Sequence, residues 1–531
     1  MRGFFSMGLC ILLAGCSHPG KRAVCSRNSD CSGEQICFVD GCGDPGEDVV
    51  AEVIPSGTNQ PFPEDFALGT VSAVQDLQIV GPSTVGGPVL QNIDLPDGGV
   101  GTVPYTDSLS VIAEGQGLAL PGPKLQYEAL LTPDKGLYSL EVTGGTYSVS
   151  AYPRDLTIPP VVQSGEHVAP GDAFALGFTF SAPSQRLFVQ GKVAKAEGLP
   201  VDVGLAVQAF DTNSEPLSQK VGFDGGAFAV MLASAARSAS SFVLTFSSLE
   251  PSSPAPQKSF TVAMPGGADA GVYLLGDYGT AFNATGRILN SLGLPLASVP
   301  VHLEGTVYGG GTYVSPTVLT DTDGNFSLLT LPSEVPGNFQ LIAIPPYPST
   351  SGLFSEPTPV SRAAPDLGSF RAPDRIILKG GVRLPDGVTP VADVTVTAVP
   401  VGPLTPLRPV PPQGDKATTD PLGNFSLTVD PADYRLDFVG NRVTPWLSTF
   451  ARVDGTVNPV QLPLAVLFNG RQLTGVVTRV EKGRSRAPQP VPLAFVRFYR
   501  KVEDLGSLRA IPLAQGFTDP RGNYKVTIPT R

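Results

Sequence analysis

Histidine and tryptophan are scarce in this sequence, with three and one among 531 residues. Neither His167 nor His302 has another histidine close to it, so the His and Glu ligands of a zinc carboxypeptidase site are missing. The chain also lacks G-x-S-x-G, a P-loop, and a complete G-x-G-x-x-G that opens a helix. We therefore expect no catalytic residues, no metal site and no cofactor.

Charge and long apolar runs are also limited. The chain has 36 Lys and Arg against 47 Asp and Glu, a net charge of −11, which argues against nucleic acid as a partner. After the N-terminus no run of 18 apolar residues exists, so we expect no membrane-spanning helix.

Glycine and proline are plentiful, with 60 and 54 residues, and at that density they break helices throughout the chain. A hydrophobic content of 41% is still enough to build packed cores, which excludes a mostly disordered chain. Recurring Val, Thr, Phe and Tyr favour strands. The predicted fold class is all-β, and the length requires several modules.

The N-terminus has the features of a secretory signal, with Arg2 followed by the apolar run Phe4–Leu13. The stretch Leu13-Ala14-Gly15-Cys16 then resembles the bacterial lipobox, which implies cleavage after residue 15 and acylation of Cys16. The alternative is an ordinary cleaved signal with Cys16 as a disulfide partner. Ser17 after the cysteine implies, by the same resemblance, export to the outer membrane. We expect a chain anchored to the bacterial outer membrane through lipidated Cys16, facing the cell surface.

Four further cysteines fall within 18 residues, in the pattern C-x5-C-x5-C-x4-C: Cys25, Cys31, Cys37 and Cys42. In an exported chain they predict two disulfides, with three connectivities open. A zinc site is the less favoured alternative, because the spacing lacks a C-x2-C pair. The following stretch, rich in Pro, Gly and acidic residues, indicates a linker.

A nine-residue motif recurs at a fixed interval. Three copies place their central glycines 99 residues apart, at Gly324, Gly423 and Gly522. A weaker copy occupies 223–228, and a fifth candidate occupies 134–140. In the three clear copies the Asp-x-x-Gly-Asn core predicts a tight turn before a strand.

Each copy also has an opening and a middle. The opening is a Gly-x-Val or Gly-x-Ile strand beginning at Gly191, Gly286, Gly380 and Gly475. The middle follows a proline and alternates apolar with other residues, as in Val299, Val301 and Leu303, which places one face of a strand in a core. The modules are therefore predicted to be antiparallel β-sandwiches.

Together the opening, the alternating strand, the T-D-x-x-G-x-F-x-L turn and a Tyr-containing strand such as Tyr434–Phe438 resemble the carboxypeptidase regulatory-like domain, a transthyretin-like β-sandwich. The resemblance implies strings of modules without catalytic residues. It covers 187–531 well and 69–181 weakly, where no Gly-x-Val opening lies in register. The expected domains are signal peptide 1–15, lipid anchor and disulfide-rich module 16–48, linker 49–68, and sandwiches 1 to 5 at 69–181, 182–279, 280–371, 372–468 and 469–531.

The last sandwich is expected to be incomplete, because after Tyr524 only Val526 and Ile528 of its return strand remain before Arg531. An open sheet edge would then be loosely ordered or would accept a strand from a partner.

Two local patterns suggest ligands. The carboxylates Asp321 and Asp323 favour calcium only weakly, since the sister copies replace the second with Leu422 and Arg521, so a structural turn is preferred. Trp446 is the right residue to stack on a sugar, although packing is the preferred interpretation.

A basic cluster near the end of the chain is a candidate anion-binding loop, formed by Arg479, Lys482, Arg484 and Arg486. A solvated turn is the preferred interpretation of this loop. We expect a structural or adhesive surface lipoprotein that binds a protein or a glycan. The alternatives are a periplasm-facing scaffold of an envelope complex and, less favoured, an enzyme with its site in 69–181.

Overall fold

The computed structural model describes residues 36–530 except 39–40, 45–46, 57–62, 118, 120–124, 132–135, 196–197, 199–200, 202, 234–240, 251–253, 264–268, 277–278, 308–310, 334–338, 402–410, 441–444, 481–486 and 505–506. These residues form strands and loops with short 3-10 segments such as η2 (Pro183–Gln185), which confirms the predicted all-β fold. Within the described part of the chain, no helix is long and apolar enough to cross a membrane.

Sandwiches 1 and 2 each pack two sheets face to face. The strands of sandwich 1 are β6 (Ser83–Asp94), β7 (Val100–Pro104), β8 (Leu109–Gly117), β9 (Leu125–Leu131), β10 (Leu137–Val142), β11 (Gly145–Pro153), β12 (Val161–Val168), β13 (Ala173–Ala175) and β14 (Phe178–Phe180). Those of sandwich 2 are β15 (Leu187–Ala194), β16 (Leu205–Phe210), β17 (Val221–Phe223), β18 (Ala227–Leu232), β19 (Ser241–Ser248), β20 (Lys258–Ala263) and β21 (Asp269–Leu274). In sandwich 2 the sheet orders are β18-β15-β21 and β17-β16-β19-β20.

Sandwiches 3 and 4 repeat this arrangement. Sandwich 3 contains β22 (Phe282–Leu289), β23 (Pro300–Thr306), β24 (Thr312–Val314), β25 (Val318–Leu319), β26 (Asn325–Thr330), β27 (Phe339–Ala343), β28 (Phe354–Thr358) and β29 (Asp366–Arg371). Sandwich 4 contains β30 (Ile376–Arg383), β31 (Thr395–Val401), β32 (Lys416–Thr418), β33 (Asn424–Val429), β34 (Ala432–Val439), β35 (Leu447–Val453), β36 (Val460–Gln461) and β37 (Ala465–Val466). In both, the opening strand pairs antiparallel with the strand after the turn and parallel with a strand from the end of the module.

The turns at Gly324, Gly423 and Gly522 are equivalent, as the repeat predicts. Their φ angles are +78°, +72° and +78°, a region that residues with a Cβ seldom adopt. Each glycine N–H donates to the carbonyl of the aspartate three residues earlier, at 2.8 to 3.0 Å. A Cβ at any of them would lie 2.4 to 2.5 Å from a backbone oxygen of the opening strand. Glycine is therefore required by both conformation and space.

The aspartate that starts each turn uses its carboxylate within the turn. Asp321 Oδ1 accepts the N–H groups of Asn325 at 2.8 Å and Asp323 at 2.9 Å. These hydrogen bonds, with the Asn325 bond first, hold the pKa of Asp321 below its usual range. The same bonds recur at Asp420 and Asp519, which is the geometry of a structural turn.

Sandwich 1 has the same turn despite its weak match. Val89 N–H donates to Gly136 O at 2.7 Å, as Val193 N–H donates to Gly226 O at 2.6 Å in sandwich 2. Gly136 has a φ of +73°. The opening signal is present as Gly87-Pro88-Val89, and sequence analysis missed it because its distance to the next opening departs from the regular spacing of the others.

Sandwich 5 is complete, so the prediction of missing strands is wrong. Its C-terminal strands are β38 (Asn469–Arg479), β39 (Gln489–Pro490), β40 (Phe495–Asp504), β41 (Ser507–Phe517) and β42 (Asn523–Thr530). The remaining three are β3 (Val49–Ile54), β4 (Glu64–Gly69) and β5 (Leu77–Ile79). Strand β3 pairs antiparallel with β40, and β5 pairs parallel with β38. They follow one another as β19, β20 and β21 do after the turn strand of sandwich 2.

Residues 49–68 are therefore not a linker, and sandwich 1 begins only at β6. Alternate residues Val49, Ala51 and Val53 are at most 1% exposed and join the core of sandwich 5 with Phe498 and Val526. Burial of this alternating face drives the pairing of the two ends of the chain. The Pro, Gly and acidic content of this segment suggested a linker, whereas its alternating apolar residues mark a strand.

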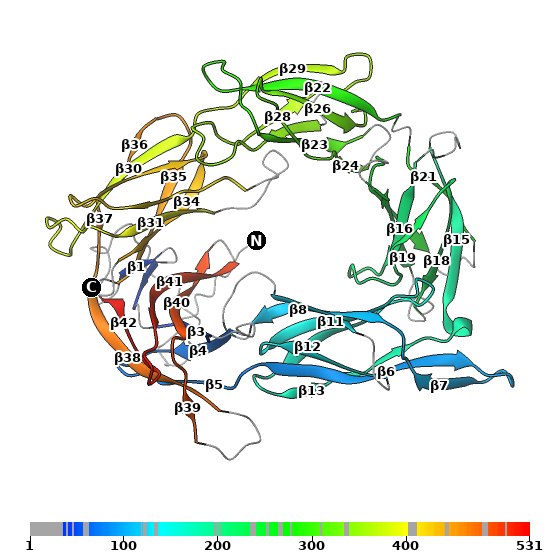
Figure 1. Cartoon of the computed structure of the whole chain (residues 1–531), viewed down its shortest axis with the longest axis horizontal. Coiled ribbons are helices and arrows are strands. Elements are labelled where there is room, and N and C mark those ends of the chain that lie inside the picture. The colour runs from blue at the N-terminus through cyan, green and yellow to red at the C-terminus, as the bar shows by residue number, and fades with distance from the viewer. Residues whose placement is uncertain are drawn as a thin grey trace, which may run out of the picture.

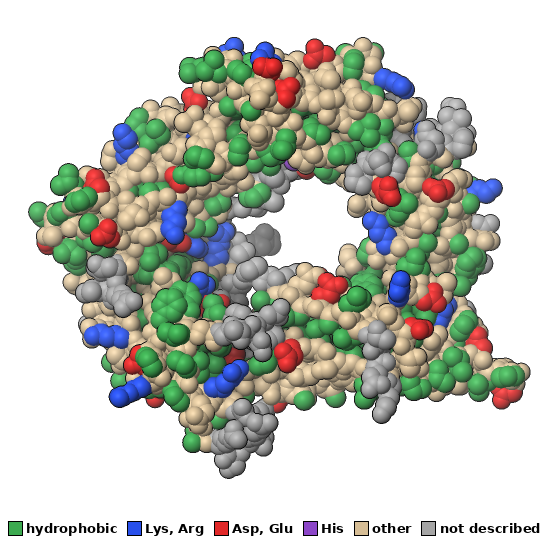
Figure 2. Space-filling view, in the orientation of Figure 1, with side chains coloured by type: hydrophobic (Ala, Val, Ile, Leu, Met, Phe, Trp, Pro, Cys, Tyr) green, Lys and Arg blue, Asp and Glu red, His purple; other side chains and the backbone are tan. Residues whose placement is uncertain are grey.

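Because the chain enters and leaves through sandwich 5, the five sandwiches form a closed ring (Figure 1). Connections between successive sandwiches are short: 80–82, 181–186, 275–281, 372–375 and 467–468. The space-filling view shows an opening through the middle of the ring (Figure 2).

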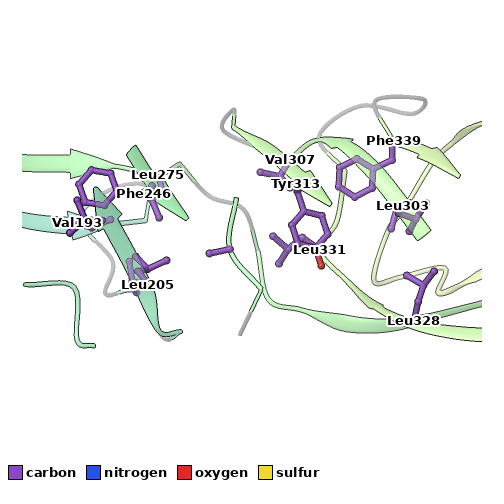
Figure 3. Packing of buried hydrophobic residues seen from close by; sticks show 14 of the residues in the cluster. Val193, Leu205, Phe246, Leu275, Leu303, Val307, Tyr313, Leu328, Leu331 and Phe339 are labelled. Carbon is purple, nitrogen blue, oxygen red and sulfur yellow. The ribbon is translucent and has the colours of Figure 1, made fainter. Parts of the chain in front are cut away.

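Sandwiches 2 and 3 share one hydrophobic cluster across their junction. Phe246 and Leu275 lie together on one side, and Tyr313 packs between Leu331 and Phe339 on the other (Figure 3). Residues 257 and 312 also exchange two backbone hydrogen bonds, at 2.7 and 3.0 Å. Buried apolar residues and backbone pairing therefore both connect sandwich 2 to sandwich 3.

A buried ion pair joins sandwiches 3 and 4. Arg375 Nε lies 3.3 Å from Asp430 Oδ1, with both side chains at most 2% exposed. The guanidinium also donates to the carbonyls of Ser349 at 2.7 Å and Pro345 at 3.0 Å. Asp430 accepts the N–H of Leu353 at 3.1 Å. Each charge is hydrogen-bonded as well as paired, as a buried pair requires.

Candidate interaction sites on sandwich 5

The N-terminal module docks on the strand that closes the ring. Arg500 on β40 is fully buried, and its Nη1 donates to Asp44 O at 2.8 Å. One residue on, Lys501 N–H donates to Asp48 O at 2.9 Å. The segment that follows the disulfide-rich module is thus fixed to sandwich 5 immediately before β3 begins.

The disulfide-rich module is described only at its end. Strands β1 (Ile36–Phe38) and β2 (Gly41–Gly43) are antiparallel, with Cys37 opposite Cys42 in register. Cys42 is disulfide-bonded. Cys16, Cys25 and Cys31 lie outside the described residues, so the lipidation and the disulfide connectivity stay predictions.

Of the predicted anion-binding cluster, only Arg479 belongs to the described residues; Lys482, Arg484 and Arg486 lie outside them. The Arg479 guanidinium lies beside Gly81, where an added Cβ would be 3.2 Å from Nη2. It also acts electrostatically on the Glu64 carboxylate. Arg479 therefore serves the junction between sandwiches 5 and 1.

Glu64 on β4 holds the same junction. Its Oε1 accepts the N–H groups of Val80 at 2.9 Å and Gly81 at 2.6 Å, at the point where β5 continues into sandwich 1. Only 4% of Glu64 is exposed, and this burial raises its pKa, against the lowering effect of the two N–H donors and Arg479. Next to it, Asp65 Oδ2 accepts Ala119 N–H of sandwich 1 at 2.8 Å.

A groove of about 1050 Å³ lies between sandwiches 4 and 5. Its floor is the outer face of β38 and β42, where alternate residues share one side of the sheet. The register pairs Gln472 with Thr527 and Thr474 with Lys525 across this floor. Val74 and Asp76, just before β5, extend the floor at its edge.

The walls of the groove carry its aromatic residues. Trp446, the single tryptophan of the chain, comes from the connection between β34 and β35 in sandwich 4. Its backbone N–H donates to Leu513 O of β41 at 3.2 Å, which fixes the connection against sandwich 5. Phe517 ends β41, is 62% exposed, and packs on Phe495 with ring centroids 4.8 Å apart.

Several polar side chains of the groove form no hydrogen bond or ion pair with any described protein group. They are Gln472, Gln515 and Lys525, all three exposed. The two acids are engaged instead: Asp76 Oδ1 accepts Val476 N–H at 2.9 Å, and Asp519 holds its turn. Within the described lining, the groove thus presents the free amides of Gln472 and Gln515 and the free ammonium of Lys525 beside Trp446 and Phe517.

Trp446 stands out in the sequence as the single tryptophan, but the other residues of the groove do not. Gln472, Gln515 and Phe517 lie in ordinary strand positions, and no short motif marks them. The available signal is the alternation along β38 and β42, which separates the two faces without showing what covers the outer one. Among the described residues no group of three or more His, Cys, Asp or Glu is arranged to hold a metal ion.

No family model matches the chain, and no curated protein matches it. The resemblance to the carboxypeptidase regulatory-like family therefore stays a prediction from the motifs.

Solved structures do show a likeness. A streptococcal ancillary pilin is 10% identical with a TM-score of 0.22, covering 56% of this chain and 99% of its own. The TIE protein of Bacillus anthracis is 10% identical with a TM-score of 0.15, covering 69% of each chain. The shaft pilin SpaA of Lactobacillus rhamnosus GG is 11% identical with a TM-score of 0.18, covering 35% of this chain and 96% of its own. Scores this low carry no function across, so the proposals below rest on this chain's own residues.

Proposed function

We propose that this chain is a lipoprotein of the bacterial outer membrane, tethered through acylated Cys16 and exposed at the cell surface, where it has a structural and adhesive role. The observation that carries the proposal is the docking of the segment after the disulfide-rich module on β40. Asp44 and Asp48 are bound there by Arg500 and Lys501. A lipid tether that joins the chain here attaches the ring through sandwich 5, the module in which the ring closes.

A tether of two or three acyl chains is strong enough for this role. Each buried methylene contributes about 0.8 kcal/mol, and stable anchoring needs more than one chain. Cys16 precedes the start of β3 by a stretch that contains the disulfide-rich module, which separates the lipid from the ring.

We infer a non-catalytic role because sandwich 1 leaves little room for an unrelated catalytic domain. The enzyme alternative requires 69–181, and there Val89 and Gly136 make the repeat's turn contact. The interior is occupied by a packed cluster that includes Tyr105, Tyr147 and Phe178. Burial raises the pKa of Tyr105 to about 12, so this phenol stays neutral near pH 7.

Membrane fractionation tests the anchor. The Cys16→Ala variant should lose acylation and leave the membrane fraction, whereas Cys10→Ala, a cysteine removed with the signal, should fractionate like the parent. Retention of Cys16→Ala in the membrane as firmly as the parent contradicts the tether.

Protease treatment of intact cells tests on which side of the outer membrane the ring lies. Cleavage of the ring without lysis supports the surface assignment. Protection until the outer membrane is permeabilised would support the periplasm-facing scaffold instead.

A further inference from the structure

The groove between sandwiches 4 and 5 combines flat apolar surface with amide groups. Trp446 and Phe517 supply flat apolar surface, and Gln472 and Gln515 supply amide groups without a protein partner among the described residues. Aromatic rings accept the C–H faces of a ligand, while an amide both donates and accepts hydrogen bonds. We propose that this groove binds a neutral oligosaccharide, an inference that rests on and deepens the proposed adhesive role.

Size and shape support an extended ligand. The volume of about 1050 Å³ lies just above the range of about 300–1,000 Å³ that is typical of small-molecule sites. The floor offers a row of polar side chains on each of two adjacent strands, with Gln472 and Thr474 on β38 and Lys525 and Thr527 on β42. A chain of sugar rings running along these strands meets a new hydroxyl or amide group every second residue.

The site is held in place before a ligand arrives. Phe517 packs on Phe495, and the Arg497 Cζ atom lies 4.5 Å from the centroid of the Phe495 ring. The Trp446 backbone is hydrogen-bonded to Leu513. A rigid aromatic surface lowers the conformational entropy lost on binding.

The charges of the groove select a neutral chain. Among the described lining residues, Asp76 and Asp519 place two carboxylates in the groove against one cation, Lys525. Both carboxylates accept backbone N–H groups, so they are fixed in the site rather than free to turn away. A polyuronate would bring further carboxylates toward them, and like charges at short range disfavour binding.

The single tryptophan makes the test specific, since intrinsic indole emission reports on this groove alone. The full mature chain, extracted in detergent, is titrated with cellohexaose, maltohexaose and hexagalacturonate. A saturable change of emission with a neutral hexasaccharide, at least about tenfold tighter than with the uronate, supports the proposal. No change with either neutral sugar, or tighter binding of the uronate, overturns it.

Variants measured by calorimetry complete the test. Trp446→Ala and Gln515→Ala should each weaken the neutral sugar by about tenfold, and Trp446→Phe should restore part of the loss. Phe450→Ala, an exposed aromatic change on β35 outside the groove, should bind like the parent. Equal affinity of Trp446→Ala and the parent for the neutral sugar overturns the proposal. These measurements need no membrane, so their failure leaves the tether and surface tests unaffected.

Discussion

Arg375 Nε and Asp430 Oδ1 lie 3.3 Å apart in the junction between sandwiches 3 and 4, where neither side chain reaches solvent. The arginine comes from the connection between the two modules, and the aspartate from the turn between β33 and β34. The hydrogen bonds of Arg375 to Ser349 and Pro345 then connect this pair to sandwich 3.

Removing one partner of this pair should destabilise the chain strongly. Asp430→Ala leaves a buried guanidinium without its carboxylate, at an expected cost of about 3 kcal/mol in the free energy of unfolding. Urea unfolding at neutral pH measures the change. The control is Asp433→Ala in the same sandwich, whose pair with Arg452 is 4.0 Å long and exposed, and which should cost less than about 0.5 kcal/mol. Equal effects of the two substitutions contradict the role of burial.

The turn glycines allow a matched comparison of strain with and without a clash. Gly423 and Gly387 lie in sandwich 4 with φ of +72° and +71°. A Cβ at Gly423 meets Val382 O at 2.5 Å, whereas at Gly387 it meets nothing within 4 Å. Gly387→Ala should cost about 1 kcal/mol from φ strain alone, and Gly423→Ala about 1–3 kcal/mol more. Urea midpoints that coincide for the two variants rule out the clash.

Ring closure can be trapped covalently. Glu52 on β3 and Arg497 on β40 are directly opposed in register. Opposed residues have Cα separations of about 4.5–5.5 Å, within the range of a disulfide. The Glu52→Cys, Arg497→Cys pair should therefore crosslink within one chain and change its migration on a non-reducing gel. The pair Glu52→Cys, Arg435→Cys, which joins sandwiches 5 and 4, should stay reduced. Crosslinking only between two chains refutes closure in the monomer.

The contribution of Glu64 to the stability of the chain, at the junction between sandwiches 5 and 1, should depend on pH. Burial raises the folded-state pKa of Glu64 above its unfolded value of 4.5, so folding favours the protonated form. Stability from this group therefore rises as pH falls through the raised pKa toward 4.5, and is lost again as pH increases. Glu64→Gln keeps an acceptor for Val80 and Gly81 but cannot titrate. The urea midpoint of the parent should rise relative to that of the variant as pH falls from 7 to 4.5, and a constant difference contradicts the linkage.

Local features were predictable from the sequence where the backbone conformation allows only one residue type. The turn glycines illustrate this, because positive φ and a carbonyl within 2.5 Å of any Cβ exclude other residues, and the constraint recurs at Gly324, Gly423 and Gly522. In sandwich 1 the equivalent turn glycine is Gly136, which has a φ of +73° and a Cβ position 3.0 Å from Val89 O.

Long-range pairings were not predictable in the same way. The alternating residues of β3 show that one face is buried, but nothing in their period names β40 as the partner. The groove has the same origin, since Asp76, Trp446 and Gln515 come together only after β5 has paired with β38. Its residues are separated by up to several hundred positions, and no short motif spans that distance.

Closure of the ring has a consequence for the number of repeats. In an open array a duplicated module simply lengthens the molecule, and terminal modules need a special outer face. Here β3, β4 and β5 must return to β38 and β40, so each module must contribute its share of one full rotation. An inserted sixth copy would keep β3, β4 and β5 from pairing with β38 and β40. The core residues Val49 and Val526 of sandwich 5 would then be exposed to solvent. The geometry of ring closure thus constrains the number of repeats. Gain or loss of a module should be tolerated only if the angles at the other junctions change to compensate.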